Sequence, residues 1–320
     1  MSSSSAGITG LSVVERAMLA QKTNPEKGPL YCARRPYDGQ GSVRQFKDYY
    51  NNTAQAGGAA QTMEMMALSQ AGSKPMTAAE QTAAVPGGIT AIPREDGTDV
   101  PAYTSAPVPG GPGIVVIQEW WGVNDQVKAT AGDMAAACGA AVAVPDLYRG
   151  QLAYEAAEAN HIMSGLDWGG ALQDVRACAR WLKQNGCSKV TVIGFCMGGA
   201  LALGSGVVSE EVDACIAFYG WNGGLADVSQ MRKPTQCHFG DLDEQQGFSD
   251  KETADKLEAE LARSGCPLEF YRYPTQGHGF MNNTQWGREM QARLGRPEVE
   301  VGEIQAAMGR VKAFVAAHGT

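Results

Sequence analysis

A cysteine stands between glycines at residues 194–198, where the sequence reads GFCMG after a β-branched run and before an apolar helical pattern. This is the spacing of a nucleophile placed in a sharp turn from a strand into a helix, where the flanking side chains must be very small. The turn lifts the central side chain clear of the sheet, and the positive end of the following helix favours a thiolate. The pattern therefore predicts that Cys196 is a nucleophile. The alternative is a buried cysteine that fills a tight packing turn.

A nucleophilic thiol needs a base, and the base needs an acid that orients it. His278 lies in a glycine-flanked loop after an expected strand, and it is our candidate for the base. The acids Asp241, Asp243 and Glu244 follow the preceding expected strand. Because aspartate is also common in turns, one of the two aspartates can be structural while the other is catalytic.

A carboxylate and two tryptophans follow a further apolar run, in the segment QEWWG at residues 118–122. Burying Glu119 beside Trp120 and Trp121 costs free energy unless the carboxylate has a role or a partner. The alternative is a hydrogen-bonded structural glutamate. Backbone amides after such a strand and directly after the nucleophile, here those of Trp120 and Met197, can form an oxyanion hole.

Strands and helices alternate regularly after about residue 86, and this alternation predicts a parallel sheet with right-handed crossovers. An extended hairpin is expected around Asp96-Gly97. Near-continuous apolar runs are typical of strands buried on both faces, and we expect such strands at residues 113–120 and 140–148. Further strands are expected at residues 189–194, 212–219, 234–239 and 268–273. Helices are expected from a cap at Asn124-Asp125 to about Cys138, at 171–184, from about Met197, from a capping box at 249–252 to about Arg263, and at 303–316.

The composition changes near residue 86, which divides the chain into an N-terminal arm, residues 1–85, and a globular domain, residues 86–320. The arm contains possible helices around residues 13–18, 42–50 and 61–68, separated by glycine-rich breaks. Their apolar stripes cannot easily form a core of their own. We therefore expect the arm to lie on the globular domain, on a protein partner or on a second copy of the chain.

Composition and charge exclude several classes of protein. The 320 residues carry a formal net charge of −8, which gives no basic surface for nucleic acid or an anionic membrane. No apolar run approaches the length of a membrane span, and no secretory signal opens the sequence. The scattered cysteines and few histidines lack the spacing of a metal site or a disulfide framework, so we expect no metal, no cofactor and a reducing, cytoplasmic compartment. The serine-rich start leaves import into a plastid or another organelle as the alternative.

Four segments of the chain together resemble the dienelactone hydrolase family, the carboxymethylenebutenolidases. They are QEWWGVN at residues 118–124, PDLY at 145–148, GFCMGG at 194–199 and GHGF at 277–280. The resemblance extends from about residue 86 to the end, and it implies an α/β-hydrolase fold, a mostly parallel sheet flanked by helices, preceded by the arm. It also implies hydrolysis of a lactone or carboxylic ester through a Cys-His-Asp triad and a thioester intermediate.

By this resemblance Cys196 is the nucleophile, His278 the base and Asp243 the acid, because the family places its acid after a Gly-x-x spacer. The family holds its resting thiol with the glutamate that Glu119 matches, until substrate binding releases the thiol to the histidine. The two amides named above would form the oxyanion hole.

The sequence departs from the family where the carboxylate of the substrate is bound. Enzymes that act on dienelactone hold this carboxylate with arginines shortly after the catalytic histidine and in the segment before the nucleophile. Here residues 279–282 contain no arginine, and Arg149 is the only nearby candidate in the second segment. We therefore expect a neutral or bulkier ester, in a pocket lined by Trp121, Tyr148 and Phe280, with Arg149 as a further substrate contact.

Two other functions remain open at this point. The chain could be a structural or docking component of a larger assembly, which retains a hydrolase fold and is anchored by its arm. Cys196 could instead be a redox sensor, although no resolving cysteine is evident near it in the sequence.

Overall fold

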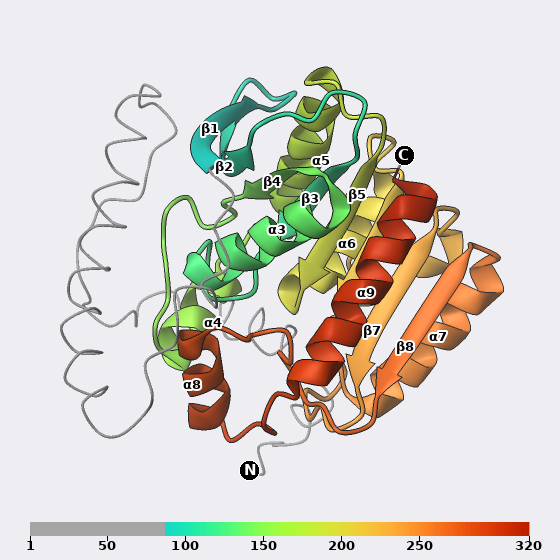
Figure 1. The fold of residues 1–320 in the computed structure, drawn as a ribbon. Coiled ribbons are helices and arrows are strands. Elements are labelled where there is room, and N and C mark those ends of the chain that lie inside the picture. Colours follow the sequence, from blue (N-terminus) through green and yellow to red (C-terminus); the bar gives the residue numbers. More distant parts are fainter. Residues whose placement is uncertain (1–86, 320) are drawn as a thin grey trace, which may run out of the picture.

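Residues 87–319 are described by the computed structural model, and they fold around one eight-stranded sheet (Figure 1). The predicted N-terminal arm and its possible helices lie outside these residues. The strands are β1 (Gly87–Pro93), β2 (Asp99–Ser105), β3 (Gly113–Ile117), β4 (Ala141–Pro145), β5 (Val190–Phe195), β6 (Ala214–Phe218), β7 (Thr235–Gly240) and β8 (Leu268–Tyr273). Their order across the sheet is β1-β2-β4-β3-β5-β6-β7-β8. β1 and β2 form the predicted antiparallel hairpin, β2 pairs antiparallel with β4, and the neighbours from β4 to β8 are parallel.

Helices cover both faces of the sheet. They are α3 (Asp125–Cys138), α4 (Ala156–Ser164), α5 (Trp168–Gln184), α6 (Met197–Val208), α7 (Lys251–Ser264), α8 (Gln285–Arg293) and α9 (Val301–His318), with a 3₁₀ turn η1 (Val228–Gln230). α3 and α9 pack on one face, whereas α5, α6 and α7 pack on the other (Figure 1). The parallel sheet between two helical layers was predicted from the alternation of elements.

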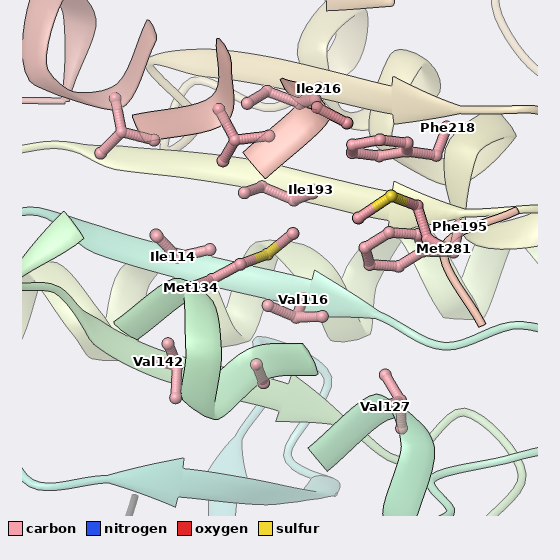
Figure 2. Close-up of a cluster of buried hydrophobic side chains, with 14 of the residues drawn as sticks. Ile114, Val116, Val127, Met134, Val142, Ile193, Phe195, Ile216, Phe218 and Met281 are labelled. Carbon is pink, nitrogen blue, oxygen red and sulfur yellow. The ribbon is translucent and has the colours of Figure 1, made fainter. Parts of the chain in front are cut away.

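Aliphatic side chains on both faces of the central strands join these layers. Figure 2 shows Ile114, Ile193 and Ile216 of β3, β5 and β6 in the cluster that also contains Met134 of α3. These four side chains are completely buried. Val115, which follows Ile114 in β3, points to the opposite face and belongs to the cluster under α5 and α6. Burial on both faces explains why the strands read as near-continuous apolar runs.

The helix starts agree with the sequence prediction at α3 and differ from it at α7. Asn124 caps α3, and its side-chain oxygen accepts from the backbone N–H of Val127 at 3.1 Å. The predicted capping box at residues 249–252 is wrong, because the N-cap of α7 is Asp250 and the hydroxyl of Ser249 turns toward a histidine instead. α4 and α8 escape the sequence prediction, since each has nine residues and so short a helix offers few repeats of the apolar pattern.

β3 and β5 lie side by side, although β4 separates them in the chain. In the strand order, β4 lies next to β3 on one side of this pair, and β6 lies next to β5 on the other side. The connections from β3 and from β5 therefore run in opposite directions along the sheet. Such a reversal leaves a crevice at the carboxyl ends of the two strands, where parallel α/β sheets bind their ligands. Glu119 follows β3 and Cys196 follows β5, so both lie at this end of the sheet.

Several features bear on the classes of protein considered above. None of the helices described is long and apolar enough to cross a bilayer. Within residues 87–319, no three histidine, cysteine or acidic side chains come together in a group that could hold a metal ion. Every cysteine in the same part of the chain is a free thiol.

Candidate active site

Cys196 forms the turn between β5 and α6. Its backbone has φ +55° and ψ −120°, a combination that residues other than glycine rarely adopt. Strain of this kind persists only where the surrounding structure enforces it, and it clusters at functional sites. The residue is 9% exposed and stands at the N-terminus of α6, where the helix favours an anion.

The glycines around Cys196 are required by close backbone contacts. A Cβ at Gly194 would lie 1.8 Å from the carbonyl oxygen of Gly198, and a Cβ at Gly198 would lie 2.6 Å from that of Ile117. A Cβ at Gly220, which follows β6, would lie 1.9 Å from the carbonyl oxygen of Cys196. No side chain fits at these positions, so the turn is held by backbone packed against backbone.

His278 stands between a carboxylate and the thiol. Its Nδ1 lies 2.8 Å from Oδ2 of Asp243, and the ring is near enough to Cys196 for that residue to raise the pKa of His278. Because Nδ1 faces the carboxylate, Nε2 is the nitrogen left for the sulfur. Asp243 and His278 are 5% and 6% exposed, so water screens their interaction weakly.

The charges of the buried side chains shift the pKa values of His278 and Asp243. Burial alone would lower the pKa of His278, but the charges of Asp243 and of the Cys196 thiolate outweigh it and raise the pKa to about 10. Burial would raise the pKa of Asp243, yet the charge of His278 and its hydrogen bond lower it below the ordinary value. A positively charged ring beside the sulfur stabilises a thiolate.

The other acids of the same loop are placed differently. Asp241 forms an ion pair with Arg272 of β8, which also pairs with Asp255 of α7. Glu244 is exposed. Of the three acids singled out in the sequence, the structure brings Asp243 to the histidine.

Two backbone amides are available beside the nucleophile. The segment after β3 passes against the start of α6, since a Cβ at Gly198 would lie 2.6 Å and 2.7 Å from the carbonyl oxygens of Ile117 and Gln118. This approach brings Gln118, two residues before Trp120, to the N-terminus of α6, where Met197 is the first residue. Within residues 87–319, neither the Trp120 nor the Met197 amide donates to a protein acceptor. Unpaired N–H groups at a helix start can stabilise an oxyanion.

Glu119 is buried, with 8% of its surface exposed, and neutral donors hold its carboxylate. The hydroxyl of Tyr219 donates to Oε1 at 2.9 Å, and Nδ2 of Asn282 lies 3.0 Å from Oε1 and 2.9 Å from Oε2. Among the described residues, Glu119 has no cationic partner and no hydrogen bond to Cys196. The contact between Glu119 and the resting thiol that the family resemblance implies is therefore not formed here.

Two of the aromatic residues expected at the substrate lie near the site residues described above: Tyr148 contacts Met197, and Trp121 lines a pocket with Glu119. The hydroxyl of Tyr148 donates to Sδ of Met197 at 3.2 Å, and burial raises the pKa of that hydroxyl. Trp121 packs edge-on against Trp286 of α8, with the ring centroids 5.4 Å apart. It also lines a pocket that reaches Glu119. Both rings are largely buried, so either can offer an edge but not a whole face.

The other two predicted substrate contacts, Arg149 and Phe280, have partners within the protein. Arg149 forms an ion pair with Asp174 of α5 at 2.7 Å, and Arg94 binds the same carboxylate at 2.9 Å, so the guanidinium of Arg149 is already paired. Phe280 is 1% exposed and packs against Tyr273 in the core, with the ring centroids 4.6 Å apart. The partner of Arg149 lies in another element, α5, and cannot be read from the local motif.

Tyr219, Ser249 and Asn282 contact the site, and the sequence interpretation did not assign them a role. Tyr219 follows β6 directly, with φ +38°, and this position at a strand end was the signal that could have identified it. The sequence interpretation considered Asn282 only as part of the segment in which the arginine of the family is absent. The capping-box pattern at residues 249–252 assigned the hydroxyl of Ser249 to a helix cap, so its contact with His278 was not predicted.

Comparisons with known proteins identify the family of the chain. The dienelactone hydrolase family matches residues 100–296, more than half of the chain. A protein of Azospirillum brasilense named "Putative carboxymethylenebutenolidase" is 29% identical over 246 residues, which are 71% of this chain and 97% of that one. A protein of Aquifex aeolicus with the same name is 30% identical over 202 residues, 59% of this chain and 84% of that one.

Solved structures share the fold. One is described as a "Putative Dienelactone Hydrolase" from Klebsiella pneumoniae, with a TM-score of 0.61 and 20% identity over 72% of this chain and 98% of that one. Another is a dienelactone hydrolase-like promiscuous phosphotriesterase from metagenomic libraries, with a TM-score of 0.59 and 21% identity over 73% of this chain and 99% of that one. At such identities the likeness shows the fold alone, which is that of the α/β-hydrolases. Together with the family match over residues 100–296, it establishes that the chain belongs to the dienelactone hydrolase family and is a hydrolase.

Proposed function

We propose that the protein hydrolyses neutral carboxylic esters or lactones, with Cys196 as the nucleophile, His278 as the base and Asp243 as the acid that orients the base. The observation that carries this proposal is the position of His278, whose Nδ1 lies 2.8 Å from Asp243 while Nε2 is left for a thiol on a strained turn. A cysteine that only fills space needs neither the strained backbone nor the buried acid–base pair beside it.

The first half of the reaction forms a thioester. The Cys196 thiolate attacks the carbonyl carbon of the substrate, a carbon–sulfur bond forms, and the carbonyl electron pair moves onto the oxygen. The amides of Trp120 and Met197 donate to this oxyanion. When the electron pair returns, the carbon–oxygen single bond breaks, and the departing alkoxide takes the proton of His278.

The second half releases the acid. His278, now neutral, takes a proton from water as the water oxygen attacks the thioester carbon. The carbon–sulfur bond then breaks, which frees the carboxylic acid and restores the thiolate beside a protonated ring. With a lactone the alcohol stays attached to the acyl group, so the product is a hydroxy acid. Asp243 stays ionised throughout and holds the ring in place.

The buried carboxylate of Glu119 favours a substrate whose acyl group is uncharged. Glu119 is a buried carboxylate with neutral partners, and no cation among the described residues forms an ion pair with it. Arg149, the arginine expected nearby, is paired with Asp174. A second carboxylate about 6 Å from Glu119 would meet a repulsion of about 3 kcal/mol at an effective dielectric constant near 20.

Substitution of the nucleophile and the base tests the catalytic roles. With p-nitrophenyl acetate, Cys196→Ala and His278→Ala should each lower kcat/KM by about 10⁴-fold or more. Cys178→Ala removes a fully buried thiol in α5, and His161→Ala removes an exposed imidazole in α4, so these variants are controls that should keep wild-type activity. Full activity in Cys196→Ala or His278→Ala would refute the proposed chemistry.

The charge of the acyl group tests the substrate class. We expect kcat/KM for p-nitrophenyl propionate to exceed that for the anionic p-nitrophenyl hemisuccinate by about 100-fold, the factor that corresponds to the repulsion above. The variant Glu119→Gln should shrink this ratio, because it removes the repelling charge and keeps the shape. A preference of the wild type for the anionic ester would contradict the assignment to neutral substrates.

A further inference from the structure

Ser249 carries a buried hydroxyl that does not cap the neighbouring helix α7. The residue precedes α7, but the N-cap of this helix is Asp250, whose carboxylate accepts from the backbone N–H of Gly247 at 2.9 Å. Ser249 itself has 0% of its surface exposed. A buried hydroxyl costs free energy unless it is hydrogen-bonded, so its contacts elsewhere must account for it.

The hydroxyl of Ser249 contacts both members of the acid–base pair. Its Oγ lies 3.0 Å from Nδ1 of His278, and the hydroxyl is near enough to Asp243 to help lower the pKa of that carboxyl. The same carboxylate lies 2.8 Å from Nδ1 and accepts from the backbone N–H of Gln245 at 2.9 Å. Ser249, Asp243 and His278 therefore form a closed group on the side of the ring that faces away from the thiol.

This arrangement fixes where the proton of the ring lies. A serine hydroxyl has one proton, and directing it to Asp243 leaves lone pairs of Oγ toward Nδ1. Nδ1 then faces two acceptors, Oδ2 of Asp243 and Oγ of Ser249, and must carry a proton to satisfy them. A neutral ring protonated on Nδ1 has its free electron pair on Nε2, which is the tautomer that can accept the proton of the thiol.

We propose that Ser249 is a positioning residue of the hydrolytic site, which holds His278 in the Nδ1-protonated tautomer and fixes the direction of its ring. The inference rests on the proposed function, because it assigns a role in the reaction of Cys196 and His278. The hydroxyl is buried behind the ring and cannot touch the substrate. Its loss should therefore lower kcat and leave KM unchanged.

The variant Ser249→Ala tests this role with p-nitrophenyl acetate. We expect kcat to fall about 10- to 100-fold, the effect of losing a hydrogen bond to a charged group. In an Asp243→Ala background the same substitution should have no further effect, because the positioning acts through the Asp243–His278 pair. Ser205→Ala is the matched control: it removes an equally buried hydroxyl that has no hydrogen-bond partner within residues 87–319, and it should keep wild-type kcat.

A second measurement identifies the tautomer of the ring directly. Nitrogen-15 NMR of the wild-type protein with labelled histidine identifies which ring nitrogen of His278 carries the proton when the ring is neutral. The proposal predicts Nδ1, with its proton protected from exchange with solvent. Ser249→Ala should weaken this protection.

Three results would overturn the proposal. They are wild-type kcat in Ser249→Ala, a neutral His278 that carries its proton on Nε2, and an undiminished effect of Ser249→Ala in the Asp243→Ala background, which would be a general effect on the fold. Each of them can be told from a failure of the proposed function, because that failure would appear as activity retained in Cys196→Ala.

Discussion

The substitution Gly194→Ala tests the turn that presents the nucleophile. The new Cβ would lie 1.8 Å from the carbonyl oxygen of Gly198, 2.2 Å from its carbonyl carbon and 2.8 Å from the backbone nitrogen of Gly199. All three atoms belong to the backbone, so no side-chain movement relieves the contact. Overpacking typically costs 1–3 kcal/mol, and a clash with three backbone atoms places this variant at the upper end, about 3 kcal/mol.

Both stability and activity should respond to Gly194→Ala. For a domain of this size each kcal/mol lowers Tm by about 2–4 °C, so Tm should fall by about 6–12 °C. Relief of the clash also displaces Cys196, two residues later, and a displacement of about 1 Å can lower a rate about 100-fold. Thermal unfolding followed by circular dichroism and kcat/KM for p-nitrophenyl acetate measure the two effects.

Gly302→Ala is the control for this substitution. Gly302 is exposed in α9, and a Cβ there would meet no atom of the described residues within 4 Å. Alanine at this position should raise stability by about 0.5–1 kcal/mol, because it restricts the unfolded chain and favours the helix. If Gly194→Ala behaved like Gly302→Ala, with unchanged or higher Tm and wild-type activity, the account of the turn would be refuted.

Two further predictions concern the loop acids and a buried histidine. Asp243→Asn should lower kcat/KM by about 10³–10⁴-fold, because it removes the acceptor that orients the base. Asp241→Asn, which only breaks the ion pair with Arg272, should keep wild-type activity and change stability by less than about 1 kcal/mol; equal losses in the two variants would contradict the assignment. Burial and the charge of Arg310 hold the pKa of His238 well below 6.5. Below pH 6.5 the unfolded chain therefore binds a proton at this histidine that the folded chain does not. Each pH unit below about 6.5 should lower the free energy of unfolding by about 1.4 kcal/mol. Urea unfolding at pH 5 and pH 7 should show this loss in the wild type and not in His238→Gln, and an equal pH dependence in both proteins would contradict it.

The sequence alone could locate the residues of the site because the fold places strand ends together. Glu119, Cys196 and His278 each follow an apolar run that is a parallel strand in the structure, and the carboxyl ends of such strands meet at one edge. The glycine spacing around Cys196 required the sharp turn, since close backbone contacts exclude any larger residue there. These predictions depended on backbone geometry, which short motifs determine.

Contacts between segments distant in sequence could not be predicted in this way. Arg149 pairs with Asp174, and no local pattern relates the two residues. The side-chain amide of Asn282 holds Glu119, which is 163 residues earlier in the chain. Ser249 fits a capping box by sequence, but its hydroxyl is used by His278. In each case a hydrogen bond or an ion pair to a distant partner decided the role of the side chain.

The central claim is that Cys196 becomes covalently acylated during hydrolysis. Rapid mixing of the full chain with p-nitrophenyl acetate, acid quenching within the first turnover and mass spectrometry of the digested protein measure this directly. The account predicts one acetyl group on the peptide that contains Cys196, formed in the wild type and absent in Cys196→Ala. Turnover of the ester with no acyl group on Cys196, or with the acyl group on another residue, would contradict it.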